Sequence, residues 1–564
     1  MSPISSSSTK LTGPRSLTGS HAGPVRQVVD TLVCLALAVI LFRTFQIEGY
    51  VISTGSMAPS LLGYHKRVQC PACGRLFAFG IAHDSGPGGS HTKAADRRLN
   101  SRSRIGRPVL SVCPNCGQDS IDVSRVPRNQ GDQLLVHKNA YLFQNPSRWE
   151  VVVFRNPHRP TQPYVKRIVG LPGEAVQIVD GDVVIDGQIE RKSLATQRAM
   201  RVPVYDHSHV PNSGDSGWQP RWIALNSEKP WKLQEVGFVL QDPLSAQATR
   251  AQSRSWVSYR HWIRSGGFHK TSLLLKQVPH DWQSPDLASV NVDESAEGVR
   301  LTCVGAMSRN ARERLLASSD LSGFQEPMRE LYQQSHVAPI TDSYGYNRVE
   351  GGIRPVPVRD IMFSAELVLL GGDGEFIVRM TDQTHIFDFE LDLGEGQMKL
   401  RIDEDQLPVR SARLGRDLTN KPMRIEMSLF DRQVLIAVND RTIFEPWKIP
   451  ANADEAKSSR QPVSFGGRGL AANVRALKLF RDVHYTRKGV SEACQLGPDE
   501  YYVLGDNSPI SFDSRSWHDR AVNRRLFLGK PFVVHLPSRP GKVKIGGRTA
   551  YFRIPDFSRI RYIR

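Results

Sequence analysis

The sequence predicts a mainly β protein of several domains with one membrane-spanning helix near its N-terminus. Its 564 residues exceed the size of one ordinary domain. A single long apolar run lies near the N-terminus, and apolar residues alternate with polar ones in several later segments, as in half-buried strands. Hydrophobic residues make up 40% of the chain and charged residues 23%, a balance that excludes a wholly disordered chain, a coiled coil and a polytopic membrane protein.

The N-terminal segment predicts a disordered tail followed by a membrane anchor. Residues 1–24 are rich in Ser, Thr, Gly and Pro, and residues 25–47 are mostly apolar around the uncharged run 31–42. A cleavable signal peptide is the alternative, but no small-x-small cleavage site follows Phe42. Basic residues before the span favour an inside N-terminus. We therefore expect a single-pass protein of the cell (cytoplasmic or inner) membrane, with its catalytic domain outside.

Three short stretches far apart in the chain carry residues suited to catalysis. These stretches are residues 49–62, 162–174 and 501–517. The first holds Ser56 in a predicted turn, the second holds Lys166 in an apolar run typical of a β-strand, and the third holds Ser511 after a Gly-Asp-Asn turn. A serine hydroxyl is a weak nucleophile and needs a base beside it. A lysine can be that base only when it is neutral, and an apolar wall disfavours its charged form.

These stretches, with residues 131–138 between the first two, resemble in their order the motif boxes of bacterial type I signal (leader) peptidases. The resemblance covers residues 25–62, 131–187 and 498–535. It implies a signal-peptidase-like antiparallel β catalytic core after the anchor. It also implies a membrane-anchored serine endopeptidase that cleaves N-terminal signal peptides from exported preproteins through a Ser/Lys dyad, with no cofactor for catalysis. The alternative is a catalytically idle relative that acts as an envelope-surface binding or scaffold protein.

The resemblance assigns a role to each catalytic residue. Ser56 is the nucleophile, and Lys166 is the general base that later protonates the leaving amine. Ser511 aligns with the serine that orients the lysine. The hydroxyl of Thr54 joins the Ser56 backbone N–H in an oxyanion hole, usually a large catalytic contribution. Thr54 and the preceding Ser53 stand where the family commonly has Pro-Ser.

Further residues take structural and substrate-binding roles from the same resemblance. The Gly-Asp-Asn turn that holds the Ser511 loop consists of Gly505, Asp506 and Asn507. The ion pair beneath the site consists of Asp513 and Arg515. The residues that line shallow apolar pockets for small side chains are Ile52, Met57, Leu61, Tyr164 and Val165. Ordinary core packing is the alternative for these apolar residues. A bound peptide is expected to lie extended along strand edges near residues 51–54 and 162–166.

Four cysteines form two Cys-Pro-x-Cys pairs in the first insertion, residues 67–130. They are Cys70, Cys73, Cys113 and Cys116. The two pairs resemble a zinc ribbon with four thiolates, so we expect a structural zinc. Disulfide or redox chemistry outside the cytoplasm and free thiols are the alternatives, and residues 84–108 form a flexible Gly/Ser/Arg-rich loop between the pairs. Cys303 and Cys494 stand alone, and the sequence leaves open whether they pair with each other.

A second, larger insertion separates the lysine stretch from the Gly-Asp-Asn stretch. Residues 191–355 have no pattern of known type, whereas residues 356–490 alternate with period two between short turns, which predicts a β-sandwich of the jelly-roll kind. Such folds often bind carbohydrate, so a carbohydrate or another envelope component is a candidate ligand. A spacer or docking platform is the alternative. The catalytic core is then divided among residues 48–66, 131–190 and 491–564.

The chain is strongly basic, which bears on its partners. Lys+Arg number 74 against 56 Asp+Glu, a formal charge of +18. Such an excess attracts the anionic face of a bilayer or nucleic acid. The basic C-terminal tail, residues 541–564, and the loop 97–107 are candidates for contact with lipid headgroups. We expect no nucleic-acid partner, because the exported topology keeps the charge away from nucleic acid and the sequence has no recognition motif. The expected partners are signal peptides of preproteins and the lipid bilayer.

Overall fold

The computed structural model describes most of the chain. The described residues are 23–81, 109–211, 218–225, 231–234, 236–241, 254–264, 266, 270–275, 290–295, 297–347, 355–403, 405, 407–415, 418–450, 459–489, 492–545 and 548–563. Strands dominate these residues, so the prediction of a mainly β protein is confirmed. Residues 1–22 of the tail expected at 1–24 and the whole loop expected at 84–108 lie outside the described residues, and Pro24 already belongs to the first helix.

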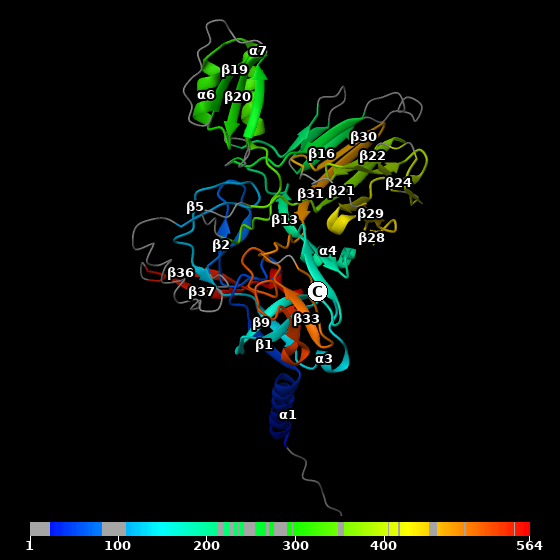
Figure 1. The fold of residues 1–564 in the computed structure, drawn as a ribbon. Helices are drawn as coiled ribbons and strands as arrows, with labels where there is room; N and C mark the ends of the chain where they lie inside the picture. The colour runs from blue at the N-terminus through cyan, green and yellow to red at the C-terminus, as the bar shows by residue number, and fades with distance from the viewer. Residues whose placement is uncertain are drawn as a thin grey trace, which may run out of the picture.

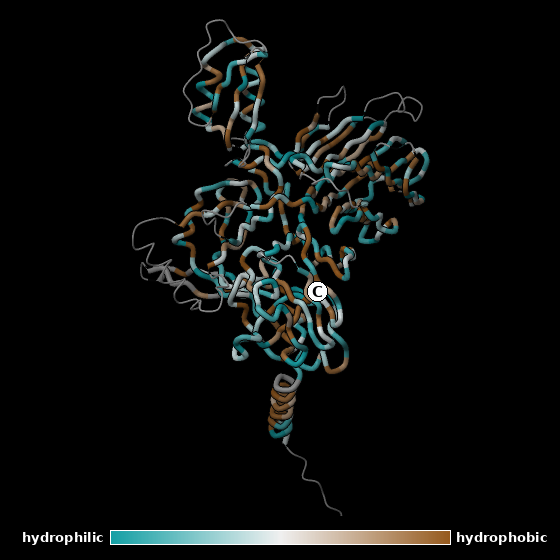
Figure 2. Tube along the Cα trace, in the orientation of Figure 1, coloured by the Kyte–Doolittle hydropathy of each residue, from teal (hydrophilic) through white to brown (hydrophobic). Residues whose placement is uncertain are grey.

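One apolar helix, α1 (Pro24–Phe45), projects from the rest of the molecule (Figure 1). Residues 24–41 are long and apolar enough to cross a membrane, and none of this window is buried against the protein. Apolar residues run along most of the helix (Figure 2). Burying these side chains in lipid rather than water is favourable, so the helix is a candidate membrane span at the predicted position.

The sheet that carries the predicted catalytic stretches is antiparallel and stands directly on α1 (Figure 1). Its strand order is β1 (Ile47–Val51), β7 (Gln133–His137), β35 (Phe527–Val534), β8 (Val151–Asn156), β9 (Arg159–Gly170), β33 (Glu500–Leu504) and β34 (Val522–Asn523), with β38 (Arg561–Tyr562) paired to β35. The short helix α3 (Ala140–Phe143) joins β7 to β8. Neighbouring strands therefore come from the beginning, the first third and the end of the chain.

Smaller sheets complete this core. One consists of β10 (Ala175–Val179), β11 (Asp182–Ile185), β12 (Gln188–Ile189) and β32 (Cys494–Gln495), and another is a hairpin of β36 (Ser538–Ile545) and β37 (Arg548–Pro555), which precedes β38 in the chain. The cysteine-containing insertion consists of β2 (His65–Gln69), β3 (Leu76–Gly80) and β6 (Arg128–Asn129) in one sheet and β4 (Leu110–Ser111) with β5 (Ile121–Asp122) in another. Apolar side chains of the insertion pack into the same buried cluster as the sandwich described next.

The large insertion forms two sheets that face each other across that cluster. One contains β15 (Lys232–Gln234), β16 (Gly237–Gln241), β31 (Ala471–Arg481), β21 (Ile361–Gly371), β26 (Pro422–Ser428), β27 (Gln433–Val438) and β28 (Arg441–Thr442), with β13 (Val202–Asp206) and β29 (Trp447–Lys448) at its sides. The other contains β14 (Trp222–Ala224), β17 (Ser255–Tyr259), β30 (Val463–Arg468), β22 (Glu375–Thr381), β23 (Ile386–Asp392), β24 (Gln397–Ile402) and β25 (Arg410–Arg413). The sandwich thus takes strands from both sides of residue 355, where the sequence places a boundary.

A small α+β unit lies at the far end of the molecule from α1 (Figure 1). It packs α6 (Arg309–Ala317) and α7 (Ser322–His336) with a sheet of β18 (Lys270–Leu275), β20 (Gly298–Val304) and β19 (Val290–Ser295) around its own buried cluster. Cys303 lies in that cluster, whereas Cys494 lies in a cluster of the catalytic core, and both are free thiols. The two lone cysteines therefore do not pair.

Candidate active site

Ser56 lies in a buried turn between β1 and β2. Only 4% of the residue is exposed, and its Oγ lies 3.4 Å from the Oγ1 of Thr54. The backbone N–H of Asn507 donates to the Ser56 carbonyl over 2.9 Å, and the Asn507 side chain donates to the Gly55 carbonyl over 3.0 Å. The Gly-Asp-Asn turn therefore holds the serine turn as well as the loop that follows it.

Lys166 lies in β9 with 1% of the residue exposed. Its cross-strand partner is the fully buried Val152, and its Nζ lies 5.6 Å from the centre of the Tyr164 ring. The amine donates to the Oγ of Ser511 over 3.1 Å. A hydroxyl oxygen can accept a hydrogen bond from either a charged or a neutral amine, so this contact orients the amine and is compatible with both forms.

Ser511 meets the serine turn at Gly505. A Cβ on Gly505 would lie 2.2 Å from the Ser511 Oγ and 2.5 Å from the Ser56 carbonyl oxygen, closer than real Cβ atoms approach other atoms. The absence of a side chain at this position thus lets the two serine segments come together. The Ser511 N–H donates to the Asn507 carbonyl over 3.0 Å, and the amine of Lys488 donates to the Ser511 carbonyl.

A buried ion pair supports the Ser511 loop, at the residues predicted for it. Arg515 binds the Asp513 carboxylate through two nitrogens at 2.9 and 2.6 Å, and that carboxylate also accepts from the Gly505 N–H over 3.0 Å. Burial alone would raise the pKa of Asp513, but the charge of Arg515 outweighs burial and lowers it to about 2. The pair is therefore ionised wherever the protein is folded near neutral pH.

A second buried ion pair was not predicted. Arg167 binds both carboxylate oxygens of Asp506 at 2.8 and 2.7 Å and donates to the Trp149 carbonyl over 2.6 Å. Side chains of neighbouring strand residues point to opposite faces, so Lys166 and Arg167 serve opposite sides of β9. A charged residue inside an apolar strand needs a buried partner, and that rule could have pointed to the aspartate of the Gly-Asp-Asn turn.

A pocket opens between the end of β1 and the first half of β9. Its lining residues are Tyr50, Val51, Ile52, Ser53, Thr54, Ser56, Met57, Pro163, Tyr164, Val165 and Lys166. Four of the five residues predicted to bind substrate are among them. The fifth, Leu61, is 2% exposed and packs in the core cluster of Ile52 and Met57 beneath the pocket. Within the described strands β1 lies at the edge of the sheet, and β9 pairs with β33 only from Arg167 onwards, so the pocket lies between the edge strand and the part of β9 that precedes this pairing.

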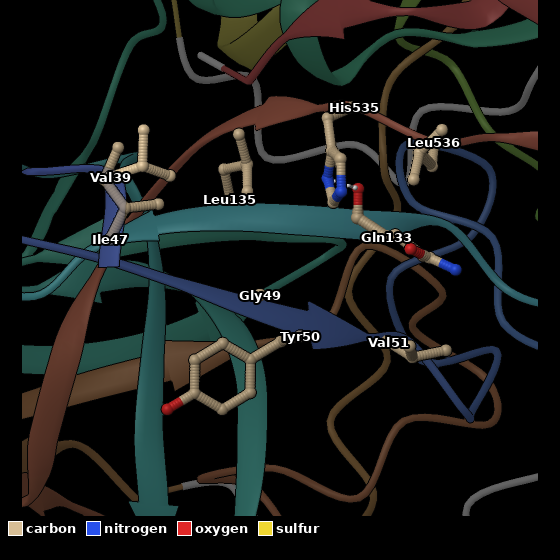
Figure 3. Close-up of a pocket in the computed structure, with 9 residues that line it drawn as sticks. All are labelled: Val39, Ile47, Gly49, Tyr50, Val51, Gln133, Leu135, His535 and Leu536. Carbon is tan, nitrogen blue, oxygen red and sulfur yellow. Dashed lines mark hydrogen bonds between the residues drawn. The ribbon is translucent and has the colours of Figure 1, made fainter. Parts of the chain in front are cut away.

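A second, more apolar pocket lies beside α1 (Figure 3). Val39 of α1, Ile47 of β1, Leu135 of β7 and Leu536 supply much of its lining. Tyr50 and Val51 line this pocket as well as the one that holds Ser56. The pocket beside the helix and the pocket that holds Ser56 are therefore neighbours that share these two residues.

The four cysteines of the first insertion converge as predicted. Their sulfur atoms all lie within 4.8 Å of one another, with the Cys70–Cys116 and Cys73–Cys113 sulfurs 3.6 and 3.8 Å apart. All four are free thiols and buried. Each pair forms the same turn, in which the N–H of the glycine after the second cysteine donates to the carbonyl of the first, and both glycines have φ of +71°. Two matching turns with four convergent soft donors suit a metal of tetrahedral preference.

The comparisons with known proteins agree with this geometry. The family model "Signal peptidase, peptidase S26" matches residues 125–226. This part of the chain is therefore similar to a signal peptidase domain. A probable signal peptidase I-2 of Synechocystis sp. is 28% identical over 170 residues, which are 29% of this chain and 72% of the relative. Signal peptidase I of Rickettsia massiliae is 38% identical over 66 residues, which are 12% of this chain and 25% of the relative.

The other similarities are shorter or more distant. Signal peptidase I of Leptolyngbya laminosa is 40% identical over 65 residues, which are 10% of this chain and 32% of the relative, so the chain spans a third or less of this relative and the Rickettsia one. A solved carbohydrate-binding module of Bacillus subtilis is similar over 21% of this chain and 74% of the module, at 13% identity and a TM-score of 0.18. The signal peptidase resemblance read from the motifs is confirmed, and it concerns the catalytic core.

Proposed function

We propose that the chain is a membrane-anchored serine endopeptidase that removes signal peptides from exported preproteins, with Ser56 and Lys166 as its catalytic dyad. The observation that carries the proposal is the convergence of Ser56, Lys166 and Ser511 from three distant segments, with Ser56 and Lys166 lining one pocket. The signal peptidase relatives support the choice of substrate. The intact set of three residues disfavours the alternative of a catalytically idle scaffold.

The proposed reaction is acyl transfer in two steps. The Ser56 Oγ attacks the scissile carbonyl carbon while its proton passes to the neutral Lys166 amine. The Ser56 N–H and the Thr54 hydroxyl donate to the oxyanion that forms. When the peptide C–N bond breaks, Lys166 returns the proton to the leaving amine, and the signal peptide remains as an ester of Ser56. Lys166 then takes a proton from a water molecule, which attacks the ester and releases the signal peptide acid and free Ser56.

The substrate is proposed to bind as an added strand. An extended peptide between β1 and the first half of β9 would form main-chain hydrogen bonds with these strands, which give affinity without regard to its side chains. Ile52, Met57, Tyr164 and Val165 limit the size of the side chains beside the scissile bond, with Leu61 beneath them. The apolar segment of the signal peptide is proposed to lie in the pocket beside α1 (Figure 3).

The membrane position follows from the same geometry. With α1 across the cell membrane and its N-terminus inside, the catalytic sheet lies at the outer surface. Lys138 and Asn139 contact Gln46, which directly follows the helix, so the sheet is fixed close to the point where the chain leaves the bilayer. A signal peptide that is still in the membrane can then reach Ser56.

The four cysteines are proposed to hold a structural zinc ion. Tetrahedral coordination at a Zn–S distance of about 2.3 Å places the sulfurs about 3.8 Å apart. The Cys70–Cys116 and Cys73–Cys113 sulfur separations are close to this value. Bound zinc would cross-link the two cysteine turns. Metal analysis of the purified chain should find one zinc per molecule, and a chelator should lower the melting temperature. A disulfide between any two of the cysteines, found by mass spectrometry of the unreduced chain, would contradict this assignment.

The sandwich is a candidate site for a carbohydrate or another envelope component. The outer face of the seven-stranded sheet presents Trp256 with the Arg379 guanidinium 4.8 Å from its ring centre, beside a ladder of charged side chains that includes Asp388, Glu390 and Arg401. Aromatic faces flanked by hydrogen-bonding groups are suited to sugar rings. Binding of cell-wall glycan fragments that Trp256→Ala abolishes is the expected result.

The activity itself is tested with an Ala-x-Ala preprotein in detergent. We expect cleavage by the full chain, and Ser56→Ala should lower kcat by about 10³-fold or more, because the nucleophile is lost. Ser60→Ala is the matched control, since Ser60 lies in the same turn but outside the pocket. Retained cleavage in Ser56→Ala would remove the assignment of the nucleophile.

A further inference from the structure

A four-residue turn of the large insertion, residues 344–347, lies against the serine turn. It follows α7 and precedes β21, so it lies outside all three catalytic stretches of the sequence. Tyr344 and Tyr346 are nevertheless buried, with 7% and 4% exposed. Each of three side chains in this turn has a separate contact with the catalytic core.

Asn347 forms a reciprocal amide pair with Asn507. Each side-chain nitrogen donates to the other side-chain oxygen, both over 2.8 Å. Asn507 also uses its side chain on the Gly55 carbonyl and its backbone N–H on the Ser56 carbonyl. The amide of Asn507 has two donor hydrogens, and these contacts occupy both. Asn347 therefore fixes the orientation of the amide that holds the serine turn.

Tyr344 contacts the neighbouring residue of the same Gly-Asp-Asn turn. Its hydroxyl donates to the Asp506 carbonyl over 2.7 Å. The guanidinium of Arg481 lies 4.4 Å from the centre of the Tyr344 ring and donates to the carbonyls of Asp342 and Ser343 over 3.0 and 3.1 Å. Arg481 ends β31 of the sandwich and is 1% exposed, so the sandwich itself anchors the 344–347 turn.

Tyr346 packs between two glycines of the core. A Cβ on Gly55 or on Gly80 would lie 2.3 Å from its Cε1 atom, so the ring can approach both backbones only because these residues lack side chains. Its hydroxyl donates to the Tyr64 carbonyl over 3.1 Å, and its carbonyl accepts from the Gly80 N–H over 2.7 Å. The residue directly before Ser56 is thus in contact with the insertion.

We infer that the 344–347 turn positions the nucleophile: Asn347 and Tyr344 hold the Gly-Asp-Asn turn, which in turn holds Ser56 at its distance from Lys166. Neither residue touches the reacting atoms, so both are positioning residues. The inference rests on the proposed peptidase function and gives the insertion a part in it. Because the reaction depends on a short proton transfer, a small displacement of Ser56 lowers the rate of the chemical step.

The test compares single variants of the full chain in detergent on an Ala-x-Ala preprotein. Tyr344→Phe removes one hydroxyl and keeps the ring, and Asn347→Ala removes the amide pair. Each should lower kcat about 5- to 10-fold at unchanged KM, the size expected for one lost hydrogen bond acting on the chemical step. Tyr332→Phe is the matched control, because Tyr332 packs in the separate core of the small α+β unit. It should leave kcat and KM unchanged.

A double-mutant cycle isolates the direct contact. If Asn347 acts through Asn507, the variant Asn347→Ala/Asn507→Ala should lose less activity than the product of the two single losses. Wild-type kcat in both Tyr344→Phe and Asn347→Ala would overturn the inference, as would a rise in KM with kcat unchanged. In those cases cleavage by the parent chain still supports the proposed function. Absence of cleavage by the parent chain would instead refute that function.

Discussion

Lys166 and Lys192 are the two least exposed lysines among the described residues, and their surroundings differ in kind. Lys166 is 1% exposed and Lys192 is 3% exposed. Lys166 donates to the hydroxyl of Ser511 in the catalytic sheet. Lys192 follows β12 and forms ion pairs with the carboxylates of Asp431 and Asp482, the latter at 2.7 Å. Burial alone would lower the pKa of Lys192, but these two carboxylates outweigh burial and raise it.

The two partner sets suit different roles, the proposed catalytic role for Lys166 and an assembly role for Lys192. Asp431 lies between β26 and β27 and Asp482 directly follows β31, so both belong to the sandwich, whereas Lys192 extends from the sheet of β10–β12. A permanent cation between two carboxylates attaches the insertion to the core. A lysine bonded to a hydroxyl can give up its proton, as a base must. The identity of the partner, rather than the degree of burial, separates the two roles.

The largest expected effect follows from replacing Lys166, the proposed general base. Lys166→Met keeps an unbranched side chain of similar length in an apolar site but has no proton acceptor, so kcat for preprotein cleavage should fall about 10³-fold or more. The melting temperature should change little, because an apolar side chain is well accommodated beside Val152. Measured cleavage near the wild-type rate would show that Lys166 is not the base.

The same substitution at Lys192 should have the opposite consequence. Lys192→Met leaves the carboxylates of Asp431 and Asp482 buried without their cation, which costs about 3–5 kcal/mol in unfolding free energy. Denaturant unfolding measures that loss, and the folded fraction should retain its kcat. As a control, Lys478→Met removes a lysine that is 43% exposed beside Asp206 and should cost under about 1 kcal/mol. An equal loss of unfolding free energy in Lys192→Met and Lys478→Met would contradict the assembly role of Lys192.

Much of the fold and of the candidate site follows from local sequence. The span of α1, the strand around Lys166 and the alternation of β22 to β24 are properties of short segments, which apolar patterning specifies. The four cysteines were recognisable because ligand spacing is itself a local property. The Asp513–Arg515 pair was predicted from the resemblance to signal peptidases, whose motif places its two residues close together in the sequence.

The contacts that join distant segments could not be predicted in this way. Nothing near Lys192 in the sequence indicates its partners, which lie more than two hundred residues away. Asn347 and Asn507, which are 160 residues apart, and Arg167 and Asp506, which are 339 residues apart, are likewise joined only by the fold. The strands within residues 202–259 pair with sandwich strands that lie far away in the sequence. Local periodicity cannot predict which strands pair with each other. A buried charge in an apolar run is the one local signal that such a partner must exist.

The smallest expected effect is a pH dependence of stability in the cluster around Lys192. Asp360 accepts from the Asp431 N–H over 2.7 Å, and burial, together with the nearby Asp431 and Asp482 carboxylates, raises the pKa of Asp360 to about 7. Burial likewise raises the pKa of Asp431 to about 6 despite the charge of Lys192. In the unfolded chain these carboxyls have a pKa of about 3.9.

Between about pH 4 and 7 the folded state therefore binds more protons at these two carboxyls than the unfolded state does. The contribution of these two carboxyls to the unfolding free energy therefore rises as pH falls through that range and is lowest above pH 7.

Asp360→Asn keeps the acceptor for the Asp431 N–H and removes the charge, so it should stabilise the protein at pH 8 by on the order of 1 kcal/mol and reduce the pH dependence. Denaturant unfolding at pH 5 and pH 8 measures both. Asp403→Asn, at an exposed carboxylate, should leave the pH dependence unchanged. If Asp360→Asn destabilises the protein equally at both pH values, the carboxylate acts as a charged partner of Lys192 and the assigned direction of its pKa is wrong.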